Sequence, residues 1–106
     1  MITSFRLQLA EDLFQDRKSR DTNRLPPWLR RTARRKVLYL HAATQLADLR
    51  VPSGNRLEQL KGNFKGYHSI RVNDQWRLVF RWLNRNVTDL QLIDYHYSVI
   101  TTNNDD

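Results

Sequence analysis

The 106-residue sequence predicts an α+β domain in which an antiparallel meander sheet packs against one long and one short N-terminal helix. Residues 62–96 contain three runs in which apolar and polar side chains alternate, as they do in half-buried strands. Residues 28–49 instead carry apolar side chains at steps of three and four, which form one stripe along a helix. At this length we expect a single domain, residues 1–106, with a modest core and a frayed tail after about residue 98.

The N-terminal quarter is the least regular part of the sequence. Alternation from Ile2 to Leu9 predicts a strand, and residues 10–14 predict a short helical turn. Residues 16–23 (DRKSRDTN) contain no apolar side chain and predict a mobile loop. Pro27 then suits the first turn of the long helix.

The long helix has two contrasting faces. Its apolar stripe, expected to face the sheet, consists of Leu29, Ala33, Val37, Leu40, Thr44 and Ala47. The opposite face carries Arg30, Arg31, Arg34, Arg35 and Lys36. Positive charge near a helix N-terminus opposes the helix dipole and costs roughly 0.3–1 kcal/mol for each poorly placed residue. The sequence leaves two interpretations open: a solvated basic face, or a docking surface for an acidic partner or a nucleic-acid backbone.

The turn at residues 51–55 (VPSGN) ends the helix, and Leu57 and Leu60 are expected to face the core. The three tryptophans are predicted to be core or core-edge residues. Tyr67 and Tyr95 are better candidates for base stacking, because strand alternation places them away from the apolar set.

Two short connections, residues 73–75 and 83–86, divide the sheet into hairpins. If Val72 and Trp76 flank the first connection, Arg71 and Arg77 lie opposite each other on the face away from the core. Like charges in that arrangement destabilise a strand pair. The two side chains therefore either diverge into water or hold an anion.

The third strand ends in Asp94-Tyr95-His96. Alternation sends Asp94 and His96 to one side and Tyr95 to the other. A carboxylate beside an imidazole is either an ordinary surface pair or a proton-transfer pair, since histidine titrates near neutral pH.

Composition narrows the function classes. The formal charge of +7 and the sequence pI near 10.4 favour a polyanionic or acidic partner. No cysteine is present, and the three histidines have no ligand spacing, so we expect neither a metal site nor a cofactor. No run resembles a membrane helix or a signal peptide, and a cytoplasmic location is expected.

Three stretches carry a specific resemblance: residues 54–62 (GNRLEQLKG), residues 66–80 (GYHSIRVNDQWRLVF) and residues 94–96 (DYH). With these stretches the chain resembles, from Ile2 to His96, the HigB-type toxins of bacterial toxin–antitoxin modules, within the RelE/ParE superfamily. The resemblance implies a RelE-like fold with a concave basic cleft and an endoribonuclease that cleaves messenger RNA in the ribosomal A site. It also implies a HigA-like helix-turn-helix antitoxin as partner, and repression of operator DNA by the pair.

The resemblance places the catalytic positions at Lys61, Arg77, Asp94, Tyr95 and His96. We add Arg56, Lys65, His68 and Arg71 as expected RNA contacts. Some HigB proteins have a histidine where this chain has Glu58, so Glu58 is either a substitute base or a surface carboxylate.

Metal-independent RNA cleavage needs a base for the 2′-hydroxyl, positive groups at the phosphate and an acid for the leaving oxygen. We assign proton transfer to His96, oriented by Asp94, and the phosphate to Lys61 and Arg77. Two alternatives remain open. A ParE-like gyrase inhibitor shares the fold but needs no acid/base set, and a non-enzymatic basic module needs only the arginines.

Overall fold

The structure is a computed structural model that describes residues 1–95, so His96 and the tail lie outside the described residues. In chain order the elements are α1 (Gln8–Gln15), α2 (Arg20–Asn23), α3 (Pro27–Ala42), the 3₁₀ helices η1 (Leu46–Arg50) and η2 (Ser53–Asn55), β1 (Glu58–Gln59), the 3₁₀ helix η3 (Gly62–Phe64), β2 (His68–Arg71), β3 (Trp76–Leu83) and β4 (Asn86–Asp94).

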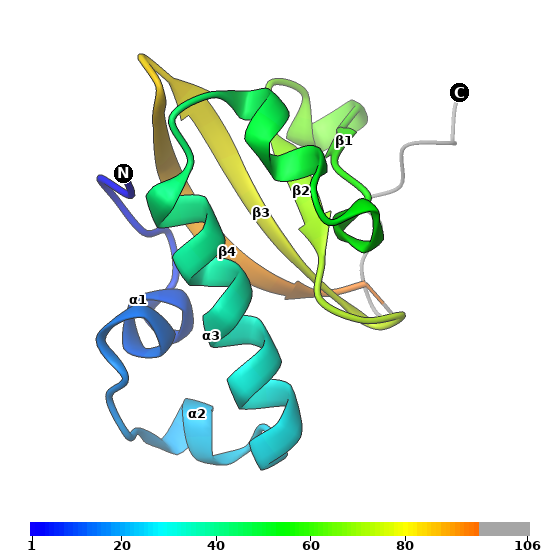
Figure 1. Cartoon of the computed structure of the whole chain (residues 1–106). Coiled ribbons are helices and arrows are strands. Elements are labelled where there is room, and N and C mark those ends of the chain that lie inside the picture. The colour runs from blue at the N-terminus through cyan, green and yellow to red at the C-terminus, as the bar shows by residue number, and fades with distance from the viewer. Residues whose placement is uncertain (96–106) are drawn as a thin grey trace.

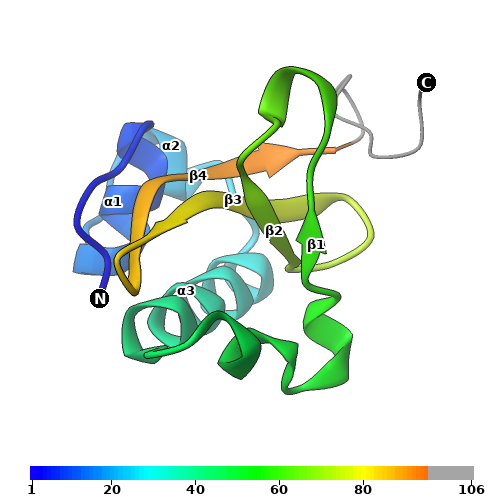
Figure 2. The same cartoon turned by 90° about the horizontal axis from the view of Figure 1, so that it is seen from above.

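Within residues 1–95 the strands form one antiparallel sheet in the order β1-β2-β3-β4. Helix α3 crosses one face of this sheet (Figure 1), and the view from above places α1 and α2 beside β4 (Figure 2). The α+β meander prediction is therefore confirmed. No helix in this part of the chain is long and apolar enough to cross a membrane.

The main core lies between the helices and one face of the sheet. The predicted stripe of α3 is buried at its first four positions, Leu29, Ala33, Val37 and Leu40, against sheet residues that include Ile70, Leu78 and Phe80. Full burial of a large aliphatic or aromatic side chain contributes roughly 1.5–3 kcal/mol. This packing holds α3 on the sheet and leaves the second face to the candidate site.

Both predicted hairpins form, and the first has the predicted register. Arg71 faces Arg77 across β2 and β3. The first connection is fixed by the Asn73 side chain, which accepts hydrogen bonds from the backbone amides of Gln75 at 2.9 Å and Trp76 at 2.8 Å. In the second connection, residues 84 and 85 both have left-handed backbone angles, φ 50° and 65°, as a type I′ hairpin requires.

The predicted N-terminal strand is wrong as a continuous element. Only two isolated parallel bridges, Ile2 with Val87 and Phe5 with Leu90, form in this segment, and α1 already begins at Gln8. The bridges are interrupted at Asp89, which has a φ of 52° and donates its backbone amide to the Ser4 hydroxyl at 2.8 Å. This bulge in β4 prevents a regular ladder along its edge.

The predicted mobile loop at residues 16–23 is also wrong, because its second half is α2. Ser19 caps this helix: its hydroxyl accepts from the Thr22 amide at 3.2 Å, and the Thr22 hydroxyl accepts from the Ser19 amide at 2.8 Å. Thr22 is only 1% exposed. A segment without apolar residues is thus ordered by capping.

The long helix ends earlier than the predicted Leu49. Backbone amides of Thr44 and Gln45 each donate to the Asp48 carboxylate at 3.0 Å, which begins η1 after α3 stops at Ala42. Thr44 and Ala47 are consequently exposed and do not continue the apolar stripe.

Two side chains of α3 lie where the sequence did not predict them. Trp28, expected at the core edge, is 55% exposed, whereas Trp76 and Trp82 pack against the core as predicted. Lys36, expected on the basic face of the helix opposite the apolar stripe, is buried and donates its ammonium group to the Asn55 Oδ1 atom. Burial, helped by the charges of nearby arginines, lowers the pKa of Lys36 below its ordinary value.

Candidate active site

The candidate site lies on the sheet face that points away from the main core. A second, smaller cluster covers part of this face and consists of buried Leu60 and Val79 with partly buried Phe64, Tyr67, Ile93 and Tyr95. The predicted separation of Tyr67 and Tyr95 from the main apolar set is therefore confirmed. The polar residues of the site surround this cluster.

Arg77 is the most tightly held polar residue on this face and is only 8% exposed. Its Nε atom donates to the Ser69 hydroxyl at 2.9 Å, and its Nη2 atom donates to the Arg56 carbonyl oxygen at 2.6 Å. Glu58 adds an ion pair at 3.6 Å. The guanidinium also lies 5.4 Å from the centre of the Tyr95 ring, a cation–π distance.

This clamp leaves one end of the guanidinium available. Among residues 1–95 the Nη1 atom of Arg77 has no hydrogen-bond partner. Because Nε and Nη2 are both held, the guanidinium cannot easily rotate, and its Nη1–H groups have a fixed direction before a ligand binds.

Burial sets the electrostatics of the site. Desolvation lowers the pKa of Arg77 and is partly offset by the Glu58 carboxylate, but a guanidinium remains charged in proteins. Desolvation raises the pKa of the Tyr95 phenol, and the Arg77 charge opposes that rise. Tyr95 is thus a neutral hydrogen-bonding group at neutral pH, beside a permanent cation.

The opposed arginines avoid each other by leaving the shared face in different directions. Arg71 turns toward the β2–β3 connection and pairs with Asp74 at 2.5 Å, whereas Arg77 turns toward β1. The carboxylate of Asp74 is exposed and has its pKa lowered by the hydrogen bond from Arg71. Each of the two arginines thus has its own carboxylate partner, Asp74 for Arg71 and Glu58 for Arg77, which relieves the repulsion expected from the sequence.

The two lysines of the predicted site come from the loop after β1. Lys61 and Lys65 line a shallow hollow of about 340 Å³ together with Gln59, Leu60 and Gly62. Gly62 has a φ of 63°, which favours glycine at this bend. Because Leu60 packs in the same small cluster as Tyr95, the loop that carries Lys61 is fastened to the site face.

Two other predicted residues point to the opposite face. His68 pairs with Phe80, and their rings lie 6.0 Å apart within the helix-covered side. Burial lowers the pKa of His68. Asp94 is paired with Trp76 and accepts a hydrogen bond from the Gln75 side-chain amide at 3.0 Å. As predicted, Asp94 and Tyr95 lie on opposite sides of the sheet. His96 lies outside the described residues, so the proposed Asp94–His96 pair stays a prediction.

Ser69 and the Arg56 carbonyl are site groups that the sequence analysis missed. Ser69 is fully buried and, by strand alternation, lies on the same side of the sheet as Arg77. That alternation could have predicted the Ser69 hydroxyl as a hydrogen-bond partner of Arg77. The Arg56 carbonyl gave no such signal, because it depends on a left-handed backbone with φ 46°. Among the described residues, no three histidine or carboxylate side chains gather as metal ligands would.

Comparison with known proteins first defines the fold class. The structure resembles a chain of the YoeB-YefM complex from Staphylococcus aureus with a TM-score of 0.50 and 20% sequence identity, over 92% of this chain and 99% of the other. A likeness at this identity shows the fold alone. It places the chain among the RelE/YoeB-like α+β folds.

The sequence comparisons define the family. Residues 3–96 match the model described as the RelE-like toxin HigB of type II toxin–antitoxin systems. Toxin HigB-1 of Vibrio cholerae is 37% identical over 97 residues, which cover 92% of this chain and 100% of that protein. Endoribonuclease HigB of Proteus vulgaris is 42% identical over 41 residues, 39% of this chain and 45% of that protein. This chain belongs to the HigB-like toxin family.

Proposed function

We propose that this chain is the toxin of a bacterial toxin–antitoxin module and acts as an endoribonuclease on messenger RNA in the ribosomal A site. Family membership supports the toxin assignment, and the name of the Proteus vulgaris relative supports RNA cleavage. The family description, a toxin of a type II toxin–antitoxin system, supports an antitoxin as partner, for which we propose a helix-turn-helix protein that neutralises the toxin and binds operator DNA together with it.

The clamped guanidinium of Arg77 is the observation that carries this proposal. Cleavage through the 2′-hydroxyl builds negative charge on the phosphate oxygens, and a preorganised donor stabilises that charge without reorganisation during the reaction. Ser69 and Arg56 hold two of the three guanidinium nitrogens, and Nη1 remains for a phosphate oxygen. Lys61 supplies a second cation from the neighbouring hollow.

The proton transfers are assigned to His96, oriented by Asp94, with Tyr95 either stacking on a base or positioning the phosphate. Arg56, Lys65 and Arg71 are assigned to the RNA backbone. His68 is stacked on Phe80 inside the helix-covered side of the sheet, so we give it no direct role in this proposal. Asp94 shares that side but is only half-buried and ends β4, so it keeps its proposed role of orienting His96. Glu58 acts mainly as the carboxylate partner of Arg77, since the two side chains form an ion pair.

The test is primer extension on a reporter messenger RNA after brief expression of each protein in growing cells. Cuts inside translated codons are expected for wild type. They should fall by about 10²–10³ in Arg77→Gln, the usual cost of losing one preorganised donor. Asp94→Ala/His96→Ala should lose the cuts as well. Arg85→Gln, in the exposed β3–β4 turn, is the matched control and should cleave like wild type.

The outcomes separate the proposal from its alternatives. Toxicity without cuts, together with inhibition of DNA supercoiling by the purified chain, would point to a gyrase inhibitor. RNA binding without any cut in translated messages would point to a non-enzymatic module. Glu58→Gln should retain cleavage; complete loss with an intact fold would make Glu58 the base instead of His96.

A further inference from the structure

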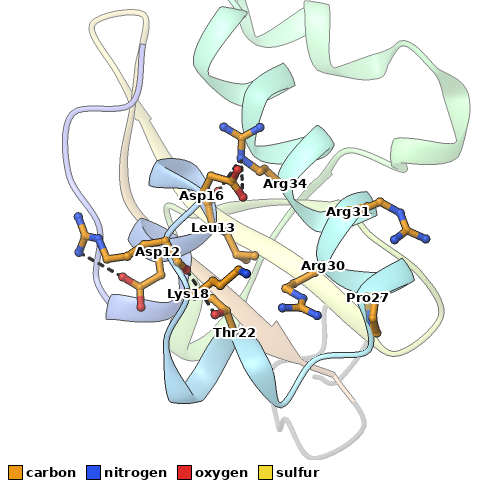
Figure 3. Close-up of a pocket in the computed structure, with 10 residues that line it drawn as sticks. Asp12, Leu13, Asp16, Lys18, Thr22, Pro27, Arg30, Arg31 and Arg34 are labelled. Atoms are coloured by element: carbon orange, nitrogen blue, oxygen red, sulfur yellow. Dashed lines mark hydrogen bonds and ion pairs between the residues drawn. The ribbon is translucent and has the colours of Figure 1, made fainter.

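A second basic concavity lies at the helical end of the molecule, away from the candidate site. It is a pocket of about 220 Å³ between α1, α2 and the first turns of α3 (Figure 3). Its lining includes five cationic side chains, Arg17, Lys18, Arg30, Arg31 and Arg34. Its two carboxylates are Asp12 and Asp16.

The carboxylates are already used by the fold. Asp12 accepts from the side chains of Gln8 at 3.0 Å and Arg17 at 3.3 Å. Asp16 lies 3.9 Å from Arg34, whose Nε atom also donates to the Leu13 carbonyl at 3.1 Å. Arg17 and Arg34 are therefore committed to holding α1 and α3 in place.

The other three cations are not balanced in this way. Lys18 and Arg31 have no hydrogen bond or ion pair with any of residues 1–95, and Arg30 has only a 3.5 Å contact to the Asn23 side chain. In Figure 3 Lys18, from the segment between α1 and α2, and Arg30, from α3, lie close to each other in the view, whereas the Arg31 side chain extends away from them. The first turn of α3 contains no acidic residue and adds the positive end of a 16-residue helix. The pocket thus attracts an anion.

Trp28, which adjoins the pocket-lining Pro27 but is not itself part of the lining, indicates which anion the pocket binds. It is 55% exposed and precedes Arg31 by three positions, so the two side chains are neighbours on the helix surface. An exposed indole beside arginine forks suits a nucleobase and its phosphates. A protein interface would instead have an apolar centre with few charges, and nucleic-acid interfaces are strongly positive throughout.

We propose that this pocket binds single-stranded RNA, with Lys18, Arg30 and Arg31 on backbone phosphates and Trp28 stacked on a base. The helices carrying it cover the opposite face of the sheet from Arg77 and Tyr95. The RNA bound here is therefore a segment other than the one presented to the candidate active site. This second site is independent of the cleavage chemistry.

The test is binding of a fluorescently labelled, non-cleavable 2′-O-methyl RNA to the full chain over a range of salt concentrations. Loss of two phosphate contacts in Arg30→Gln/Arg31→Gln should reduce the salt slope by about 1.4 and raise Kd about 25-fold at 0.1 M salt. Trp28→Ala should raise Kd about fivefold or more with the slope unchanged, because stacking releases no counterions.

The control, Arg50→Gln/Arg85→Gln, removes the same charge from two exposed positions, one in η1 and one in the β3–β4 connection, that do not line the pocket. It should change the salt slope by less than about 0.7, which is the change expected for the loss of one phosphate contact. If it acts as strongly as Arg30→Gln/Arg31→Gln, binding depends only on net charge and the proposal fails. Poly-L-glutamate is the second probe: if it, and not RNA, requires Arg30, Arg31 and Trp28, the pocket serves an acidic protein and the proposal also fails.

Repeating the measurement in an Arg77→Gln background separates the two faces. The effects on RNA binding should add, since distant sites without shared partners are usually independent. If the Arg30→Gln/Arg31→Gln effect disappears in that background, both faces hold one strand and a separate segment is ruled out. Cleavage is not measured here, so a failure of the proposed function leaves this result interpretable.

Discussion

The hydrogen bond between Ser69 and Arg77 should contribute measurably to both stability and activity. Ser69→Ala removes the acceptor of the 2.9 Å bond from Arg77 Nε at a fully buried position. A hydrogen bond to a charged group contributes about 1.5–3 kcal/mol. We expect the free energy of unfolding to fall by that amount, because alanine offers no acceptor to the buried Nε–H group.

A double-mutant cycle isolates this pair from other effects of each substitution. Urea unfolding of wild type, Ser69→Ala, Arg77→Met and the double variant can be followed by tryptophan fluorescence, since Trp76 adjoins Arg77. Residues in direct contact show coupling energies of about 0.5–3 kcal/mol, and we expect at least about 1 kcal/mol here. In the primer-extension assay Ser69→Ala should cleave less than wild type but more than Arg77→Met, because the guanidinium remains but is held only at Nη2.

Two results would refute this reasoning. The first is a loss of stability below about 0.5 kcal/mol in Ser69→Ala, within the range of ordinary surface substitutions. The second is additivity of the two substitutions, which would mean that Ser69 does not act through Arg77. Full cleavage by a folded Ser69→Ala protein would separately show that holding Nε is unimportant for catalysis.

Three further perturbations test other contacts. Asn55→Ala leaves the buried Lys36 ammonium and two backbone carbonyls without their partner, so urea unfolding should show a loss of about 2–4 kcal/mol. Burial lowers the pKa of His68 below its ordinary 6.5, so below pH 6.5 the unfolded chain binds more protons than the folded one, and the free energy of unfolding should fall as the pH drops. His68→Phe should reduce the difference between urea midpoints measured at pH 7.5 and pH 5. Ser19→Ala removes the cap of α2 and should cost about 0.5–2 kcal/mol, with faster amide exchange at Thr22.

Each of these has its own contradicting outcome. Asn63→Ala, at an exposed amide, is the control for Asn55→Ala; an equal loss of stability in both would show that the hydrogen bonds of Asn55 do not stabilise the fold. An unchanged pH dependence in His68→Phe would assign the acid sensitivity to other groups. Undiminished protection of the Thr22 amide in Ser19→Ala would show that α2 is held by packing alone.

Elements with local signals could be predicted from the order of residues alone. Strand alternation with two turn-forming connections placed Arg71 opposite Arg77 and separated Tyr95 from Asp94, since a period of two leaves little choice of face. Pro27 marked the start of α3 for a similar reason, because proline favours the first helical position.

Features that depend on partners distant in the chain became visible only in the folded protein. Lys36 belongs to an arginine-rich face by sequence, yet Asn55, 19 residues later, draws its ammonium into the interior. Arg77 became the centre of the site because a carbonyl 21 residues earlier, at Arg56, meets it across the sheet. Such contacts leave no periodic pattern, since a hydrogen bond is specified by the final position of two groups and not by their neighbours in the chain.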